Sequence, residues 1–106
     1  MRLDVGTTFE QPLVFLVKAG YFCDFDRNFS IGPPAPEVAA AHARLIDAVN
    51  AGAEAAKPGA QASDLFHAMD KIVTGGAGGS DAGRLGHGLG MQLTEWPSLT
   101  AQDHTV

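Results

Sequence analysis

The sequence predicts an α+β fold, in which a mainly antiparallel sheet with a β-hairpin carries two helices packed on one face. Three observations lead to this fold class. Two runs rich in apolar and aromatic residues, 13–17 and 21–31, flank a short turn; two later stretches repeat apolar residues at helical spacing; and a glycine-rich motif then leads into a last strand. Because 106 residues suffice for one module, residues 1–106 are expected to form a single unit.

The predicted hairpin occupies the first third of the chain. Residues 1–11 have the mixed composition of a turn, and the apolar run 13–17 that follows is typical of a buried strand. Lys18-Ala19-Gly20 is a turn candidate, after which aromatic and β-branched residues resume. We therefore expect residues 13–17 to pair antiparallel with residues 21–31.

Alternation along the second strand of the hairpin decides which side chains can meet. Successive strand residues point to opposite faces, so Asp24 and Asp26 share one face and Cys23 lies on the other. At this spacing the two acids are roughly 7 Å apart at Cβ, close enough to bracket one ion, although two solvated acids beside Arg27 explain the pattern equally well. Cys23 has no histidine near it in the sequence, which favours a buried structural thiol over a nucleophile.

Two helices are expected after the hairpin. The first spans residues 37–56 and ends at Lys57-Pro58-Gly59, and the second spans residues 63–74 with Ser63 as its N-cap. Apolar residues recur at spacings of three and four, so each helix has a side that we expect to be buried. These positions are Val38, Leu45, Ile46, Val49, Ala53 and Ala56 in the first helix, and Leu65, Phe66, Met69, Ile72 and Val73 in the second; His42 also falls on the buried side.

A glycine-rich loop, residues 75–83, precedes the strongest candidate for a functional residue. His87 stands in Gly86-His87-Gly88-Leu89-Gly90, where the glycines let the backbone take positive φ angles or pass close to a ligand. The apolar wall of a pocket is expected from Met91, Leu93 and Trp96. Neither the loop nor the motif has the pattern of a P-loop or a dinucleotide fingerprint. A loop histidine with ordinary hydrogen bonds is the alternative reading of His87.

Composition and charge exclude several classes of partner. The formal charge is −5 and the seven Lys and Arg residues are scattered, which does not suit a nucleic-acid surface. The apolar run 13–17 is far too short to span a membrane, and the charged start Met1-Arg2-Leu3-Asp4 does not look like a signal peptide. Because Cys23 is the one cysteine, an intramolecular disulfide is impossible, and a cytoplasmic location is expected.

The motif Gly86-His87-Gly88-x-Gly90, followed by Glu95-x-Pro97, resembles the metal-dependent family of creatinase, prolidase and methionine aminopeptidase, whose catalytic domain is called the pita-bread fold. The stretch from Gly20 to Phe29, with Asp24-x-x-Arg27, is similar to the family's second-strand motif, which ends in Asp-x-Thr-Arg. Lys57-Pro58-Gly59 is similar to its helix break, and the order of elements also agrees. The resemblance implies that residues 1–106 form a partial pita-bread domain like that of an Xaa-Pro peptidase.

The resemblance also implies a chemistry. In the family the motif histidine and the second-strand aspartate bind metal, which carries over to His87 and Asp24, and paired divalent ions such as Mn, Co, Fe or Zn activate a water for attack on an amide carbonyl. The implied activity is that of a metallopeptidase, a hydrolase of the Xaa-Pro dipeptidase or aminopeptidase type acting on small peptides or related molecules. Asp26 is a substitute ligand candidate. Glu95, which is no ligand in the family, is a pocket residue and joins His87 in the candidate catalytic set.

Three of the family's five metal ligands have no counterpart in the sequence. The first aspartate belongs on the first hairpin strand, where residues 13–17 contain no acid, and the last two glutamates belong beyond the Glu-x-Pro motif, past Val106. We therefore expect the metal to be weakly bound or lost. The chain is then part of a longer protein, a shortened relative without the chemistry, or a subunit whose partner completes the site.

Two other functions stay open besides the hydrolase. One is a non-catalytic pseudo-enzyme or binding module that uses the same pocket without metal, and the other is a metal-dependent lyase relative. A partial domain also leaves an unpaired sheet edge and an uncovered apolar face, which predicts self-association into a homo-oligomer.

Overall fold

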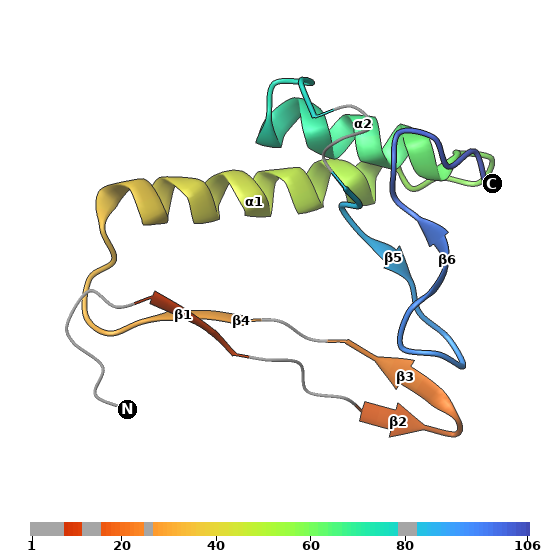
Figure 1. Ribbon diagram of the computed structural model, residues 1–106, viewed down its shortest axis with the longest axis horizontal. Coiled ribbons are helices and arrows are strands. Elements are labelled where there is room, and N and C mark those ends of the chain that lie inside the picture. The colour runs from red at the N-terminus through yellow and green to blue at the C-terminus, as the bar shows by residue number, and fades with distance from the viewer. Residues whose placement is uncertain (1–7, 12–15, 25–26, 79–82) are drawn as a thin grey trace.

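The computed structural model describes residues 8–11, 16–24, 27–78 and 83–106, and it confirms the predicted α+β architecture (Figure 1). Every strand pairing among these residues is antiparallel. Both helices lie on the same side of the hairpin strands (Figure 1). The elements are β1 (Thr8–Gln11), β2 (Leu16–Lys18), β3 (Tyr21–Cys23), β4 (Arg27–Ser30), α1 (Pro36–Ala55), α2 (Ala62–Val73), β5 (His87–Gly88) and β6 (Glu95–Ser98).

The hairpin is longer than the sequence indicates. Strands β2 and β3 pair from Leu16 opposite Cys23 to Lys18 opposite Tyr21, around a tight turn in which both central residues have positive φ. Strand β1 pairs with β4, so the expectation of a turn at residues 1–11 is wrong for residues 8–11. A partner strand satisfies the backbone groups of β1, and this outweighs its mixed local composition. Residues 13–15 of the expected first strand lie outside the described residues.

The helix boundaries agree with the prediction to within one residue at each end. Helix α1 begins with Pro36, whose fixed φ suits the first turn, and it ends just before Lys57-Pro58-Gly59. Helix α2 starts at Ala62, so Gln61 and not Ser63 is its N-cap. The Asp64 carboxylate accepts the Gln61 N–H at 2.9 Å, which satisfies the backbone at the start of the helix.

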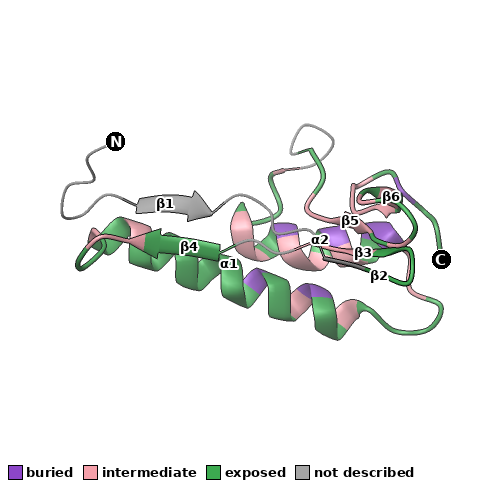
Figure 2. Ribbon diagram, turned by 90° about the horizontal axis from the view of Figure 1, so that it is seen from below, coloured by how far each residue is buried: buried purple, intermediate pink, exposed green. Residues whose placement is uncertain are grey.

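The small core lies where α1 and α2 meet. Ala48 of α1 and Ala62 and Phe66 of α2 are the buried apolar residues among those described, and Phe66 is fully inaccessible. Gly52 lets the helices approach closely, because a Cβ there would lie 2.8 Å from the sulfur of Met69. Figure 2 shows the buried positions at this contact and the exposed amino-terminal half of α1. As predicted, the apolar side of α2 points inward, with its other members half-buried.

The predicted buried stripe of α1 is wrong for its large residues. Leu45, Ile46 and Val49 are 49%, 49% and 58% exposed, and His42 is exposed as well. Val38 is half-buried, whereas Ala53 and Ala56 are exposed. The physical reason is that α1 packs on α2 through its small residues, whose size permits close approach, and this rotates the large apolar residues away from the contact.

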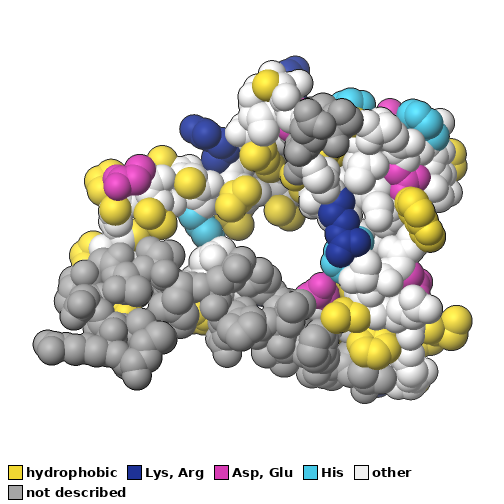
Figure 3. All heavy atoms as spheres, viewed as in Figure 1, with side chains coloured by type: hydrophobic (Ala, Val, Ile, Leu, Met, Phe, Trp, Pro, Cys, Tyr) yellow, Lys and Arg dark blue, Asp and Glu magenta, His cyan; other side chains and the backbone are white. Residues whose placement is uncertain are grey.

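The molecule is hollowed between its helices and its strands (Figure 3). A cavity of about 380 Å³ lies there between α1 and β4, and its apolar lining includes Phe29, Val38 and Leu45. Neither Asp24 nor His87 lines this cavity. Among the described residues, no helix combines the length and the apolar character needed to cross a membrane.

Candidate metal centre

The short strands β5 and β6 hold His87 in place. His87 pairs with Ser98 and Gly88 with Glu95, with an irregularity between the two positions. The pairing continues past the strands, because the Leu85 N–H donates to the carbonyl of Leu99 at 2.9 Å and the Leu99 N–H donates to that of Gly86 at 3.0 Å. The backbone on both sides of His87 is therefore fixed by β6 and the residue that follows it.

The motif glycines are needed for close approach and not for left-handed backbone. None of Gly86, Gly88 and Gly90 has a positive φ, so that part of the sequence prediction is wrong. A Cβ on Gly88 would lie 2.7 Å from the carbonyl carbon of Trp96, and one on Gly86 would lie 2.7 Å from a methyl carbon of Leu99. The atoms that face Gly88 belong to the backbone and leave no room for a side chain, whereas the Leu99 methyl that faces Gly86 can move, so it is Gly88 that lets β5 lie against β6.

One backbone hydrogen bond joins the hairpin to the histidine motif. The Phe22 N–H of β3 donates to the carbonyl of Gly90 at 2.8 Å. Asp24 follows Phe22 by two residues, just after the end of β3, and His87 precedes Gly90 by three. The bond therefore brings the two predicted ligands, which are far apart in the sequence, to the same place.

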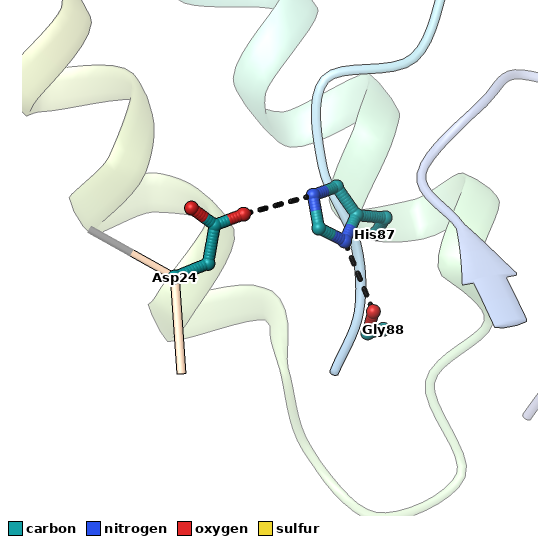
Figure 4. A network of polar contacts seen from close by, with 3 residues as sticks. All are labelled: Asp24, His87 and Gly88. Atoms are coloured by element: carbon teal, nitrogen blue, oxygen red, sulfur yellow. Dashed lines mark hydrogen bonds and ion pairs between the residues drawn. The ribbon is translucent and has the colours of Figure 1, made fainter. Parts of the chain in front are cut away.

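Asp24 and His87 face one another, as Figure 4 shows. The Oδ2 atom of Asp24 lies 3.4 Å from the Nε2 atom of His87. Their side chains are 20% and 21% exposed, so both are largely shielded by protein yet can be reached from solvent. The other ring nitrogen of His87, Nδ1, lies 3.0 Å from the carbonyl oxygen of Gly88.

Both ring nitrogens of His87 lie against acceptors, and a neutral ring has one proton for the two contacts. A proton on Nδ1 can be donated to the carbonyl of Gly88. In the neutral ring Nε2 then presents its lone pair to the Asp24 carboxylate. Two acceptors in contact repel each other unless a proton or a cation lies between them. The geometry therefore calls for a positive charge at this point.

A divalent metal ion fits this donor pair. Imidazole nitrogen and carboxylate oxygen bind Zn and similar ions at about 2.1 Å, so two ligands of one ion lie about 3.0 to 3.5 Å apart, a range that includes the observed 3.4 Å. Histidine ligands usually donate their second ring N–H to a carbonyl or a carboxylate, as His87 does to Gly88. Among the described residues, however, no third His, Cys, Asp or Glu joins the pair in a group that could hold a metal ion.

The other predicted site residues fare differently. Asp26 lies outside the described residues. Glu95 is half-buried in β6, where its Oε2 atom accepts the Gln92 N–H at 3.1 Å. It also lines a hollow of about 540 Å³ together with Gln92, Thr94, Trp96 and Ser98. The roles of His87, Asp24, Asp26 and Glu95 in metal binding and catalysis stay predictions.

The three residues of the predicted apolar wall differ in their exposure, and Trp96 lines the hollow beside Glu95. Met91 and Trp96 are each 73% exposed, and Leu93 is half-buried. Met91 lies in the turn that connects β5 to β6 at the surface, whereas Trp96 lies in β6 itself at an exposed position. Cys23 is half-buried, so the expected burial of its thiol is also incomplete. His67 and His104 are exposed on the described surface.

Sequence reasoning missed the backbone groups that build the site. These are the carbonyls of Gly88 and Gly90 and the N–H of Phe22. Backbone groups leave no residue signature, because every residue carries them. The usable signal was the spacing of the glycines, which indicates that another segment comes close to this backbone.

Comparison with known sequences identifies relatives of the chain. Residues 13–106 match the model of metallopeptidase family M24. An Xaa-Pro dipeptidase of Lactobacillus delbrueckii subsp. lactis is 36% identical over 104 residues, which make up 97% of this chain and 26% of that protein. An Xaa-Pro dipeptidase of Pyrococcus furiosus is 32% identical over 87 residues, covering 81% of this chain and 25% of that protein. The chain thus spans about a quarter of the length of these relatives.

Solved structures share the fold. The prolidase from Pyrococcus furiosus superposes with a TM-score of 0.82 at 23% identity, over 99% of this chain and 31% of that one. Dipeptidase PepE from Mycobacterium ulcerans gives a TM-score of 0.83 at 30% identity, over 96% of this chain and 28% of that one. These likenesses confirm that the chain folds as part of a pita-bread domain.

Proposed function

Since the chain belongs to metallopeptidase family M24, as its motifs predicted, we propose that it supplies part of the metal site of a hydrolase of the Xaa-Pro dipeptidase type. The observation that carries the proposal is the contact between Asp24 Oδ2 and His87 Nε2 at 3.4 Å. Relatives named Xaa-Pro dipeptidase support the class of reaction, and their names support a small peptide as the substrate.

In this proposal each residue of the centre has a defined task. Asp24 supplies a negatively charged oxygen, and His87 supplies a neutral nitrogen whose direction is fixed by its hydrogen bond to Gly88. A divalent ion such as Mn, Co, Fe or Zn, when bound, would supply an activated water and polarise the amide carbonyl. Glu95 lines a hollow with Gln92, Thr94, Trp96 and Ser98, and we propose that this hollow adjoins the metal site.

The number of ligands sets the strength of binding. Catalytic metal sites of proteins such as those for Zn have at least three protein ligands, and the described residues bring two together. We therefore propose that this segment alone binds a divalent ion weakly. Further carboxylates would have to complete a working centre.

The chain has one cysteine, Cys23, which suits a reducing compartment, and we propose that it works in the cytoplasm.

Isothermal titration of Mn²⁺ or Co²⁺ into the protein tests the proposal. We expect weak binding at one site, which Asp24→Ala and His87→Ala both abolish. His67→Ala, which removes an exposed histidine of α2, serves as the matched control and should leave binding unchanged. Binding that neither site variant affects would exclude this centre. Tight stoichiometric binding together with cleavage of Xaa-Pro peptides would show that the segment is a complete enzyme, contrary to the proposal.

A non-catalytic binding module is the second candidate. The observation that favours it is the apolar run 13–17, which contains no acid where the resembling family has its first ligand. Such a module would use the same pocket without metal. Titration with added Mn²⁺ separates the two, because a binding module takes up no ion even when it is supplied and its ligand affinity does not respond to a chelator, whereas the proposed metal site binds one ion weakly.

A further inference from the structure

We infer that Glu95 is a positioning residue for the candidate metal centre: its carboxylate shapes the turn at residues 90–92, and this turn fixes Asp24 against His87 through β3. The inference rests on the proposed function, because the separation of the two side chains matters for binding only if they hold one ligand together. Nothing in the family resemblance assigns this task to Glu95. The contacts on both sides of the turn carry the argument.

The first contacts are those of the carboxylate itself. The Oε2 atom of Glu95 accepts the N–H of Gln92 at 3.1 Å. Its other oxygen lies against Gly90, where a Cβ would stand 2.7 Å from the carboxylate carbon. The Gly90 N–H in turn donates to the carbonyl of Gln92 at 3.3 Å. The carboxylate thus fills the space that a side chain at residue 90 would need, and it holds the turn closed.

The next contact passes from the turn to the hairpin. The carbonyl of Gly90 accepts the N–H of Phe22 at 2.8 Å. Within the described residues, this is the backbone hydrogen bond that ties the strands β1 to β4 to the segment carrying His87. Asp24 follows Phe22 by two residues, so the position of Gly90 sets the position of Asp24.

The contacts that the Glu95 carboxylate already makes distinguish a positioning role from that of a metal ligand. One oxygen of Glu95 is already bonded to a backbone N–H, and the other abuts Gly90. Glu95 also forms no group with Asp24 and His87 that could hold an ion. Without the carboxylate, the Gln92 N–H would lose its acceptor and the space beside Gly90 would empty. The turn would open, and the bond from Phe22 would weaken.

Amide hydrogen exchange followed by NMR tests the inference without any metal. In Glu95→Ala we expect the Phe22 amide to exchange about three- to tenfold faster, the change that corresponds to the loss of one ordinary hydrogen bond. Amides of the α1–α2 contact, such as that of Ala48, should be unaffected. Glu95→Gln keeps an acceptor oxygen at the same reach and should restore the exchange of Phe22 to within about twofold of the original. Glu54→Ala, at an exposed position of α1, is the matched control.

Two further measurements distinguish a positioning role from a merely structural one. The ring resonances of His87 should shift in Glu95→Ala and return in Glu95→Gln, since Asp24 moves with the turn. The affinity for Co²⁺ should follow the same order. Gly90→Ala is a second variant, because the added Cβ displaces the carboxylate. Gly90→Ala should speed the exchange of the Phe22 amide and shift the His87 resonances in the same direction, and it provides the test if Glu95→Ala fails to fold.

Two results would overturn the inference. If Glu95→Ala and Glu95→Gln both abolish Co²⁺ binding while the Phe22 amide stays protected, Glu95 contacts the ion directly. If neither Glu95→Ala nor Gly90→Ala alters the exchange of Phe22 or the resonances of His87, the turn does not position the centre. Absence of Co²⁺ binding in the unaltered chain would refute the proposed function alone, since the exchange and resonance data would still decide the role of Glu95.

Discussion

Gly88 has no room for a side chain, and this gives a sharp test of how the site is built. A Cβ there would lie 2.9 Å from the carbonyl oxygen of Glu95, 2.7 Å from the carbonyl carbon of Trp96 and closer still to the oxygen of Trp96. These are backbone atoms of β6, which cannot rotate away as a side chain can. Gly88→Ala must therefore push β5 from β6. Overpacking of this kind costs about 1 to 3 kcal/mol, and we expect the upper end because the strand pairing is lost with it.

Urea unfolding followed by the fluorescence of Trp96 measures this cost. Trp96 is the single tryptophan of the chain and lies in β6, so its signal reports on the strand that the new side chain displaces. We expect the free energy of unfolding of Gly88→Ala to fall by about 2 to 3 kcal/mol. This is a large part of the roughly 5 to 15 kcal/mol that stabilises a domain.

Gly86→Ala is the matched control in the same motif. Its Cβ would meet a methyl carbon of Leu99 at 2.7 Å, and that methyl lies at the end of a side chain that can change its rotamer. We expect a loss below about 1 kcal/mol. An unchanged urea midpoint in Gly88→Ala, or equal losses in the two variants, would refute the claim that the glycines serve the close approach of β5 to β6.

Three other predictions concern the fold and its surface. Phe66→Ala, which empties a fully buried position, should lower the free energy of unfolding by about 3 to 5 kcal/mol in urea titrations followed by circular dichroism. Val49→Lys, on the exposed apolar side of α1, should weaken self-association in sedimentation velocity; an unaltered chain that stays monomeric at high concentration would contradict this. Hydrogen bonds from the side chain and amide of Thr105 lower the pKa of Asp103 below its ordinary 3.8, so its contribution to stability is present above that pH and is lost as the pH falls through the folded-state pKa. Asp103→Asn should therefore show a smaller loss of stability on acidification, measured as urea midpoints from pH 5 to about 2.

Local signals in the sequence were enough to predict where the helices begin and end. Pro36 at the start of α1 and Lys57-Pro58-Gly59 after its end mark the boundaries by backbone restriction alone. The buried face was not predictable in the same way. Periodicity shows that α1 has an apolar stripe, but the partner decides what is covered, and α2 packs on small residues such as Ala48 and Gly52.

The candidate site was predictable in its residues and not in its framework. Asp24 and His87 are distant in the sequence, and the resemblance to a family, rather than periodicity or composition, brought them together. The bonds that hold them depend on register, for example the one from Phe22 to Gly90. A pattern of side chains does not encode register where glycines replace them. The early strand at residues 8–11 was missed for a different reason: its local composition is mixed, and pairing with β4 creates it.

The central claim is that Asp24 and His87 face one divalent ion, and paramagnetic broadening by Mn²⁺ tests it most directly. Substoichiometric Mn²⁺, added to ¹⁵N-labelled protein, should first broaden the amide signals of residues 22–24 and 86–88. The signals of Ala48 and Phe66, in the contact between the helices, should persist. The broadening of the signals of residues 22–24 and 86–88 should disappear in His87→Ala. Broadening that spreads evenly over the surface carboxylates, or that survives in His87→Ala, would contradict the account.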